Sequence, residues 1–430
     1  MAALFLMQNA EIAMQALIAR LYPICRSITG DGVRETLQIL REQIPVEVRE
    51  VPTGAEVFDW TVPKEWNIRD AWIKDSLGRK LIDFRNLNLH VVGYSCPIHR
   101  RLRLAELREH LFTIPGHPAW IPYRTSYYEE NWGFCLSEEQ MSQFDDKQEY
   151  EVLIDSSLEN GHLTYGEYLL QGELAEEVLV SCHVCHPSLA DDNLSGIAVA
   201  VALALRLAEL PRRYSYRFLF IPGTIGAITW LAQNEESVFR IRHGLVLTCV
   251  GDAHDITYKR SRRGNSEIDR AFVHVLKHSG EPHSVIDFFP YGYDERQYCS
   301  PGINLPVGCV MRGRHGEFPE YHTSADNLDF VGSDALANAL AKCLAVIDVL
   351  EADRIYLNKK PKGEPQLGKR GLYGGGDAGR DGRELAYLWV LNLSDGQNSL
   401  LDIAERANLP FAAIKEAATA LSATDLLAPL

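Results

Sequence analysis

The 430-residue sequence has no apolar run close to the roughly 20 residues that a membrane-spanning helix requires, and we expect no membrane partner. Positive charge is scarce as well, because 43 Lys and Arg stand against 58 Asp and Glu, a net charge of -15. Phosphate binding needs Lys and Arg in excess on one face, so this balance disfavours nucleic acid as a partner. The first residues lack the features of a secretory signal peptide, and we expect cytoplasmic residence.

Cysteine is present in an odd number, nine, scattered through the chain. In a chain of intracellular character, such residues are more typical of reduced thiols than of a disulfide framework. The apolar fraction of 46% and the charged fraction of 23% are ordinary for a globular protein. A chain of this length is expected to form two or three domains.

Strand-like and helix-like segments alternate over the middle of the chain. This alternation predicts an α/β fold with a mainly parallel sheet flanked by helices. We expect strands over 177–182, 216–221, 244–250 and 305–311, and helices over 195–209, 266–279 and 333–351.

The remaining segments differ in character from this α/β pattern. Residues 59–150 are rich in Trp, Pro, Tyr and short alternating runs, which predicts a β-rich unit with its own small core. Residues 359–383 are rich in Gly and basic residues and predict a linker or surface loop. Residues 384–430 carry three helix-like segments, typical of a winged-helix-like domain. Acidic residues dominate there, so we expect contacts with a protein partner or with further copies of the chain rather than with DNA.

The segment 181–196, SCHVCHPSLADDNLSG, gathers His183, His186 and Asp192 just beyond a buried strand. Open α/β sheets place their functional groups at such strand ends. Far along the chain, the segment 321–326 supplies His322 close to a further carboxylate. Neutral imidazole nitrogen and carboxylate oxygen are ligands that zinc takes in proteins, so the two segments predict a metal site.

Two other interpretations of the same segment are rejected. Residues 182–186 match the C-x-x-C-H pattern of covalent haem attachment, but nothing in the chain indicates export to an oxidising compartment. A zinc knuckle would need a second Cys pair at the required spacing, which the sequence lacks.

The string ADDNLSG at 190–196, between a strand and a helix of small residues, resembles the metal-binding core of the M28 zinc aminopeptidases. Segment 321–326, YHTSAD, is similar to the Y-H-T-x-x-D element of that family, whose His is a metal ligand. The segments 293–298 and 302–306 lie where the family has its S-D-H element and a G-I-P strand entry. The resemblance implies zinc as the cofactor, with Asp192 and His322 as ligands.

The whole chain is similar to a bacterial group of aminopeptidase-like proteins, some of them linked by name to polysaccharide biosynthesis. Members of this group carry an inserted domain and a C-terminal winged helix. The matching strings are RSITG (26–30), WTVP (60–63) with EW (65–66), CHPS (185–188) and DERQY (294–298). On this basis an aminopeptidase-like domain at 1–58 and 151–358 is divided by an insertion at 59–150, and a winged-helix-like domain follows at 384–430.

The sequence departs from the M28 pattern at several positions. Alignment puts Gly223 and Thr224 where the family has a Glu-Glu pair, one serving as general base and one as ligand, and Thr248 where it has a further acidic ligand. With fewer ligands, one zinc ion is expected rather than two. The third ligand is His183 by its position at the strand end, or His186 by the Cys-His-Pro string, which we favour slightly.

A general base contributes typically 10²–10⁴-fold in rate, so the missing Glu pair bears on activity. Asp294 or Glu295 could replace it, since the resemblance puts both near the metal. For substrate binding we expect the residues Arg296, Tyr298, Arg312 and Tyr321.

These observations lead to two hypotheses. The first is a zinc-dependent, aminopeptidase-like hydrolase that cleaves an amide bond in a peptide or an amino-sugar precursor. The second is a catalytically impaired metal-binding protein that serves as a binding module for a small molecule or a protein.

Overall fold

The structure is a computed structural model, and it describes residues 2–373 and 382–430. The chain divides into two compact units, residues 1–264 with 284–340, and residues 265–283 with 341–430. The linker that the sequence predicts at 359–383 falls partly outside the described residues. No helix of the described part of the chain is long and apolar enough to cross a membrane.

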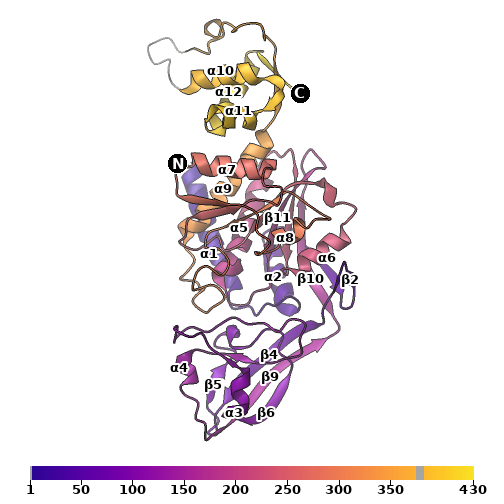
Figure 1. The fold of residues 1–430 in the computed structure, drawn as a ribbon, viewed down its shortest axis with the longest axis vertical. Helices are drawn as coiled ribbons and strands as arrows, with labels where there is room; N and C mark the ends of the chain where they lie inside the picture. The colour runs from indigo at the N-terminus through magenta and orange to yellow at the C-terminus, as the bar shows by residue number, and fades with distance from the viewer. Residues whose placement is uncertain (1, 374–381) are drawn as a thin grey trace. The chain divides into compact units, whose positions relative to one another are not determined.

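An eight-stranded sheet forms the centre of the first unit (Figure 1), with the strand order β1-β10-β12-β11-β13-β16-β14-β15. The four middle strands run parallel, whereas β1, β10 and β14 pair antiparallel to their neighbours, so the sheet is mixed. The strands are β1 (Glu47–Pro52), β10 (His162–Leu170), β11 (Glu177–His183), β12 (Ser215–Ile221), β13 (Ile241–Leu247), β14 (Ile256–Lys259), β15 (His283–Ile286) and β16 (Val307–Met311). The predicted α/β class with helices flanking the sheet is confirmed, and the expected parallel pairing holds for the four middle strands, whereas the outer pairings β1–β10, β10–β12 and β14–β16 are antiparallel.

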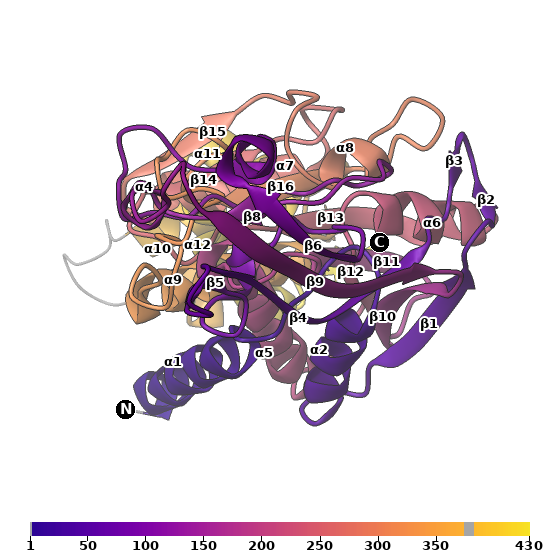
Figure 2. The same ribbon diagram turned by 90° about the horizontal axis from the view of Figure 1, so that it is seen from below.

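Helices cover both faces of this sheet, and Figure 2 shows α1 and α5 on one side and α8 on the other. The helices are α1 (Ala2–Leu21), α2 (Asp31–Arg41), α5 (Gly196–Ala208), α6 (Ile225–Gln233), α8 (Glu295–Tyr298) and α9 (Ser333–Ala352), which continues into the second unit. The sequence of α5, GIAVAVALALRLA, is apolar almost all round, which is typical of a helix buried in the core. On the other face, Leu179, Leu219 and Val246 of the sheet join one apolar cluster with Trp230 of α6 and Tyr298 of α8.

A second, antiparallel sheet of order β5-β4-β9-β6 lies in the inserted region, with strands β4 (Glu65–Lys74), β5 (Lys80–Asp83), β6 (Ile98–Arg103) and β9 (Glu149–Glu159). Its apolar residues form a separate core that includes Ile73, Phe134 and Val152. Strand β9 continues nine residues beyond 150, where the sequence placed the end of the insertion. The short elements of this region are β2 (Glu56–Val57), β3 (Trp60–Thr61), η1 (Asn88–His90), α3 (Leu104–Leu107), η2 (Arg108–His110), β7 (Leu111–Phe112), β8 (Phe134–Cys135) and α4 (Glu138–Met141).

The second unit contains the helices α7, α10, α11 and α12 and a small sheet in which β17 pairs antiparallel with both β18 and β19. Its elements are α7 (Glu267–His278), β17 (Ile355–Asn358), η5 (Gly368–Arg370), α10 (Gly382–Leu393), β18 (Asp395–Ser399), α11 (Leu400–Ala407), α12 (Phe411–Ala423) and β19 (Leu427–Pro429). Arg270 of α7 binds Asp402 and Glu405 of α11 and so ties these helices together. The three helices predicted after residue 384 are confirmed.

Candidate metal centre

The sequence-predicted metal ligands follow the central strand β11. His183 is the last residue of β11, His186 lies in the loop behind it, and Asp192 lies in the short helical segment η3 (Ala190–Ser195) that leads into α5. Every residue from 177 to 201 is buried, so this loop is enclosed by the core rather than lying on the surface. The carboxyl ends of parallel strands are where α/β proteins place their functional groups.

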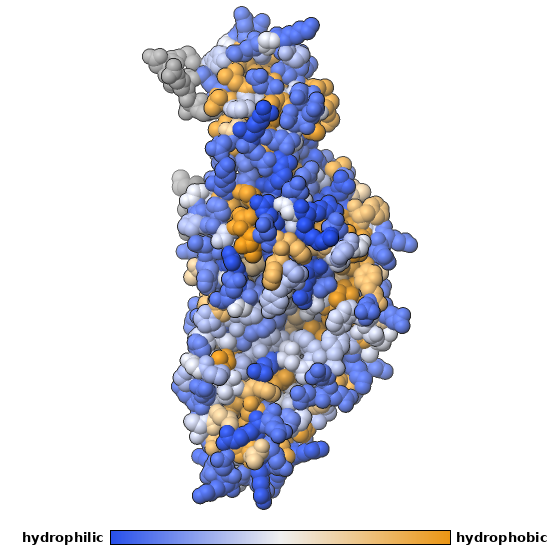
Figure 3. Space-filling model, in the orientation of Figure 1, coloured by the Kyte–Doolittle hydropathy of each residue, from blue (hydrophilic) through white to orange (hydrophobic). Residues whose placement is uncertain are grey.

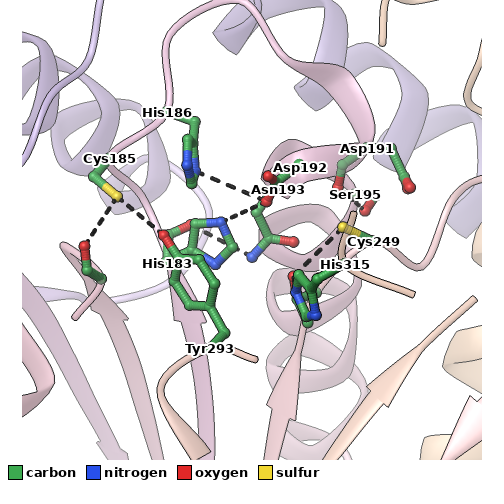
Figure 4. A network of polar contacts seen from close by, with 12 residues as sticks. His183, Cys185, His186, Asp191, Asp192, Asn193, Ser195, Cys249, Tyr293 and His315 are labelled. Atoms are coloured by element: carbon green, nitrogen blue, oxygen red, sulfur yellow. Dashed lines mark hydrogen bonds and ion pairs between the residues drawn. The ribbon is translucent and has the colours of Figure 1, made fainter. Parts of the chain in front are cut away.

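The imidazoles of His183 and His186 point toward the carboxylate of Asp192 (Figure 4). Nε2 of His183 lies 2.7 Å from Oδ1 of Asp192, and Nδ1 of His186 lies 3.8 Å from the same oxygen. His322, which reaches the site from a loop 130 residues further on, places its Nε2 3.0 Å from Oδ2. The structure therefore brings all four candidate ligands together around one carboxylate.

Burial sets the charge state of these groups. It lowers the pKa of His183 and, more strongly, that of His186, so both imidazoles are held neutral, the form that binds metals. Burial alone would raise the pKa of Asp192, but His186, His183 and His322 together hold it well below its usual range. The result is an ionised carboxylate beside neutral imidazoles.

Backbone hydrogen bonds fix the segment that carries Asp192. The carboxylate of Asp326 accepts the N–H groups of Asp191 (2.6 Å) and Asp192 (3.0 Å). Asp191 accepts the N–H of Gly251 at 2.7 Å, which links the segment to the loop after β13. Partners of this kind orient metal ligands and are part of a metal site.

Arg26 holds the loop that carries His186. Its guanidinium is buried and donates to the carbonyl oxygens of His186 (2.7 Å), Pro187 (3.0 Å) and Leu21 (2.7 Å). Burial lowers the pKa of Arg26 to about 10, so the group remains charged at neutral pH. The string at 26–30 that carried the family resemblance thus begins with a residue that supports the site.

The site is most open on the side of His322, whose side chain is 35% exposed, whereas those of His183 and Asp192 are fully buried. The ring of Tyr321, a predicted substrate-binding residue, stacks on the His322 imidazole at 3.9 Å between ring centres. Tyr321 is therefore in place beside the exposed ligand.

The ring of Tyr293 covers the opposite side of the cluster. It stacks on the His183 imidazole at 3.6 Å between ring centres, and its hydroxyl lies 3.4 Å from Sγ of Cys185. A Cβ added to Gly223, the position that we aligned with a Glu of the M28 pattern, would overlap the Tyr293 ring. At Thr248, the other altered position, the hydroxyl lies 3.2 Å from Nε2 of the buried His315.

The two candidate bases, Asp294 and Glu295, are both fully buried at the start of α8. Glu295 binds Nζ of the buried Lys259 at 2.7 Å and accepts the N–H of Tyr293 at 3.0 Å. Asp294 has no hydrogen-bond partner on either oxygen among the described residues, and burial raises its pKa well above the usual range. The two carboxyl groups therefore differ: one is neutralised by a lysine and the other is unpartnered.

The three other residues predicted to bind substrate, Tyr298, Arg312 and Arg296, differ from one another in their contacts. Tyr298 is fully buried, with its hydroxyl 2.9 Å from Oγ of Ser181, so it packs in the core. Arg312 donates to Asn338 at 2.9 Å and to the carbonyl of His254. Nε of Arg296 has no hydrogen-bond partner among the described residues. The buried Asp252, four residues beyond Thr248, accepts the N–H of Gly313 at 2.7 Å.

Sequence reasoning missed three aromatic residues of the site, Tyr123, Tyr293 and His315. The ring of Tyr123 stands edge-on to both His186 and His322, at 5.1 and 5.0 Å between ring centres. Tyr293 directly precedes the Asp294-Glu295 string and could have been considered with it. Tyr123 and His315 carry no local signal, since only the tertiary fold brings them to the metal ligands.

The arrangement fits a metal ion. The ligand atoms of His183, His186 and Asp192 all lie within 4.8 Å of one another. Two ligands of one tetrahedral zinc lie about 3.3 Å apart, and the observed separations from the Asp192 oxygens, 2.7, 3.0 and 3.8 Å, bracket that value. The buried Nδ1 of His186 also has no hydrogen-bond partner among the described residues, as expected of a nitrogen kept for a metal.

Comparison with known proteins agrees with this architecture. A relative from Clostridium acetobutylicum, named "Putative polysaccharide biosynthesis protein with aminopeptidase-like domain", is 55% identical over 96% of this chain and 95% of its own length. A crystal structure of a "putative peptidase" from the same species has a TM-score of 0.94 at 53% identity, covering 99% of this chain and 98% of that one. The close relatives are thus similar over the full length, the winged helix included.

More distant structures have a similar fold. A zinc aminopeptidase from Bacillus subtilis has a TM-score of 0.57 at 13% identity, covering 80% of this chain and 94% of its own. A peptidase M28 precursor from Shewanella amazonensis has a TM-score of 0.52 at 15% identity, covering 81% and 96%. At such identities the likeness concerns the fold alone, and in fold the chain resembles these aminopeptidases.

Family models account for nearly the whole chain. Residues 354–429 match a winged helix-turn-helix, in agreement with the helices α10, α11 and α12 and the small sheet of β17, β18 and β19. Residues 15–353 match the model described as "Domain of unknown function (DUF4910)". The chain therefore belongs to the DUF4910 family, and in this chain a winged helix-turn-helix follows the DUF4910 domain.

Proposed function

We propose that the protein is a zinc-dependent hydrolase that cleaves an amide bond in a peptide or an amino-sugar precursor. The observation that carries this proposal is the buried cluster of His183, His186, Asp192 and His322 in an aminopeptidase-like fold. Fold relatives include zinc aminopeptidases, and the name of the Clostridium acetobutylicum relative links it to polysaccharide biosynthesis. Together they support amide substrates in which one partner is an amino acid or an amino sugar.

One zinc ion is proposed, held by Asp192, by His322 and by one of the two imidazoles of His183 and His186. Bound zinc would polarise a substrate carbonyl and lower the pKa of a water molecule. Asp192 holds the imidazoles in one place through its two oxygens, and Asp326 fixes the backbone beneath it. Hydrolysis needs one free position at the metal, so in an active enzyme no more than three of the four side chains bind tightly.

For proton transfer, Asp294 is a better candidate than Glu295. The carboxylate of Glu295 is neutralised by Lys259 and fixed by the N–H of Tyr293, so taking up a proton would break a buried ion pair. Asp294 has no such partner, and its raised pKa is in the direction that suits a general base at neutral pH. The predicted test is a loss of turnover in Asp294→Asn with zinc content unchanged.

The alternative is a metal-binding module without hydrolytic activity. The observation that favours it is the Tyr293 ring, which fills the space beside Gly223 and leaves no room for a carboxylate there. In that case all four side chains can bind the ion and close its coordination shell.

The deciding experiment measures zinc per chain by elemental analysis and turnover of aminoacyl anilides and N-acyl amino sugars, in the wild type and in Asp192→Asn. Zinc together with turnover, both lost in the variant, supports the hydrolase. Zinc without turnover on any substrate supports the binding module. If no zinc copurifies and none binds on titration, both hypotheses fail.

For the winged helix we propose contacts with a protein rather than with DNA. The third helix, α12, has a single basic residue, Lys415, and that residue is bonded to Asp348 of α9. Readers of the DNA major groove present several polar or basic side chains from this helix. Fluorescence anisotropy with a labelled random-sequence duplex at low salt should show no binding, and a salt-dependent rise would contradict the proposal.

A further inference from the structure

The backbone at His322 has a conformation that needs support. Its φ angle is 57°, in the left-handed region that residues other than Gly, Asn and Asp adopt only at a cost. His322 is also the most exposed of the four candidate ligands and the only one outside the buried run 177–201. Interactions from elsewhere in the chain must therefore hold this loop.

A segment of the inserted region pairs with the loop on both sides of His322. Tyr123 donates its N–H to the carbonyl of His322 at 2.8 Å, and Ser324 donates its N–H to the carbonyl of Ile121 at 2.8 Å. The N–H of Ile121 donates to Oγ of Ser324 at 3.0 Å. Between these hydrogen bonds, Pro122 and Thr323 form an antiparallel β-bridge. This is a short piece of β-ladder between residues about 200 positions apart.

The side chain of Tyr123 also contacts two of the candidate metal ligands directly. Its ring stands edge-on to the imidazoles of His186 and His322, at interplanar angles of 74° and 78°. Edge-on packing is a favourable geometry for aromatic rings and restricts the rotation of both partners. The Tyr123 hydroxyl lies 3.1 Å from that of Tyr127, which in turn packs edge-on to Tyr94.

We infer that Tyr123 is a positioning residue of the metal site and that the inserted domain thereby completes that site. The inference rests on the proposed metal function. The β-ladder holds the backbone at His322. The Tyr123 ring sets the planes of the His186 and His322 imidazoles. On the face drawn in Figure 3, apolar surface is scattered in groups rather than gathered into one patch.

The test compares Tyr123→Phe, Tyr123→Ala and a control, Tyr128→Ala. Tyr128 is on the same loop, 51% exposed, and packs on Trp60 rather than on the ligands. Zn²⁺ affinity is measured by competition with a chelator, and coordination is followed by the visible spectrum of the Co²⁺-substituted protein. Loss of a residue that supports metal ligands typically weakens metal binding 10- to 100-fold.

We expect Tyr123→Ala to weaken Zn²⁺ binding at least tenfold and to change the Co²⁺ spectrum, while Tyr123→Phe and Tyr128→Ala stay within about threefold of the wild type. Ser324→Ala, which removes only one hydrogen bond of the ladder, should give a smaller loss and serves if Tyr123→Ala does not fold. Unchanged affinity and spectrum in folded Tyr123→Ala would overturn the inference but leave the proposed function intact. A wild type that binds neither metal would overturn the proposed function itself.

Discussion

Gly223 and Tyr293 share one space: the Tyr293 ring lies where the Cβ of any other residue at position 223 would be. The carbonyl of Gly223 and the hydroxyl of Tyr293 both contact Sγ of Cys185, at 3.6 and 3.4 Å. These contacts hold the Tyr293 ring stacked against the imidazole of His183. Glycine at 223 is thus required by the packing around the candidate metal site.

Gly223→Ala should consequently destabilise the fold. Overpacking of a well-packed interior costs roughly 1–3 kcal/mol, and the added methyl group here meets a ring that is itself stacked on His183. Urea unfolding should show the loss as a lower transition midpoint with an unchanged slope.

Removal of the ring provides the control for this prediction. In Gly223→Ala combined with Tyr293→Ala, the total loss should be smaller than the sum of the two single losses by about 1 kcal/mol or more. Strictly additive losses would show that the two residues do not compete for space. The same reasoning means that Gly223→Glu, the change that would restore the M28 pattern, has to be made together with Tyr293→Ala.

The histidines can be ranked as metal ligands by single substitutions. The sequence slightly favours His186 as the third ligand, but in the structure Nε2 of His183 lies closer to the Asp192 carboxylate than does Nδ1 of His186, 2.7 against 3.8 Å. If the site keeps a free position for hydrolysis, His183→Ala should abolish tight zinc binding, while His186→Ala should retain the ion with weaker affinity. Isothermal titration with Zn²⁺ measures both.

Equal and complete loss of zinc in both variants would instead indicate a closed shell of four ligands, and hence the binding module. His162→Ala provides the matched control, because His162 is an exposed residue of β10 and its loss should leave zinc binding unchanged.

Removing one member of the buried ion pair between Lys259 and Glu295 should lower the stability of the fold strongly. Their side chains are 3% and 0% exposed, and Lys259→Met would leave the Glu295 carboxylate buried without its counter-charge. Breaking a buried ion pair in this way costs about 3–5 kcal/mol. The free energy of unfolding in urea is the measurement, and the exposed pair of Arg20 and Glu42 offers a control, since Arg20→Met should change stability little.

Replacing both members of the pair tests whether Glu295 has more than a structural role. Lys259→Met combined with Glu295→Leu should recover most of the lost stability, because no unpaired charge remains. Turnover that also recovers would exclude Glu295 as the catalytic base. A double variant as unstable as the single one would contradict the ion-pair explanation.

Local pattern was sufficient to predict the elements that carry the buried ligands. The strand expected at 177–182 is β11 (Glu177–His183), and the helix expected at 195–209 is α5 (Gly196–Ala208), because apolar runs of different length and residue type distinguish buried strands from buried helices. The strand expected at 244–250 begins and ends three residues earlier, as β13 (Ile241–Leu247). Cys249, one of the last predicted residues, has a φ of 48° and so departs from the extended backbone of a strand.

Nothing local predicts the contacts between distant segments. The family resemblance joined Asp192 with His322, but the ring of Tyr123 reaches these ligands from another part of the chain, through a β-ladder that no periodicity reveals. The packing of Tyr293 against Gly223 is equally invisible, since a glycine after a strand is ordinary in a turn. Sequence thus predicts which residue types the site holds, and the tertiary fold decides which aromatic rings surround them.

The buried His243 of β13 should make the fold sensitive to mild acid. Burial, together with the nearby Arg242 and Arg213, lowers its pKa to about 3 from a usual value near 6.5. Between these two pH values the unfolded chain binds a proton that the folded chain does not, so stability falls as the pH falls below 6.5. For this group alone the loss between pH 7 and pH 5 is about 2 kcal/mol. His243→Gln should therefore lose about that much less stability over the same interval, whatever its stability at pH 7. Urea unfolding at the two pH values gives the comparison, and parallel losses in wild type and His243→Gln would show that other groups govern the acid sensitivity.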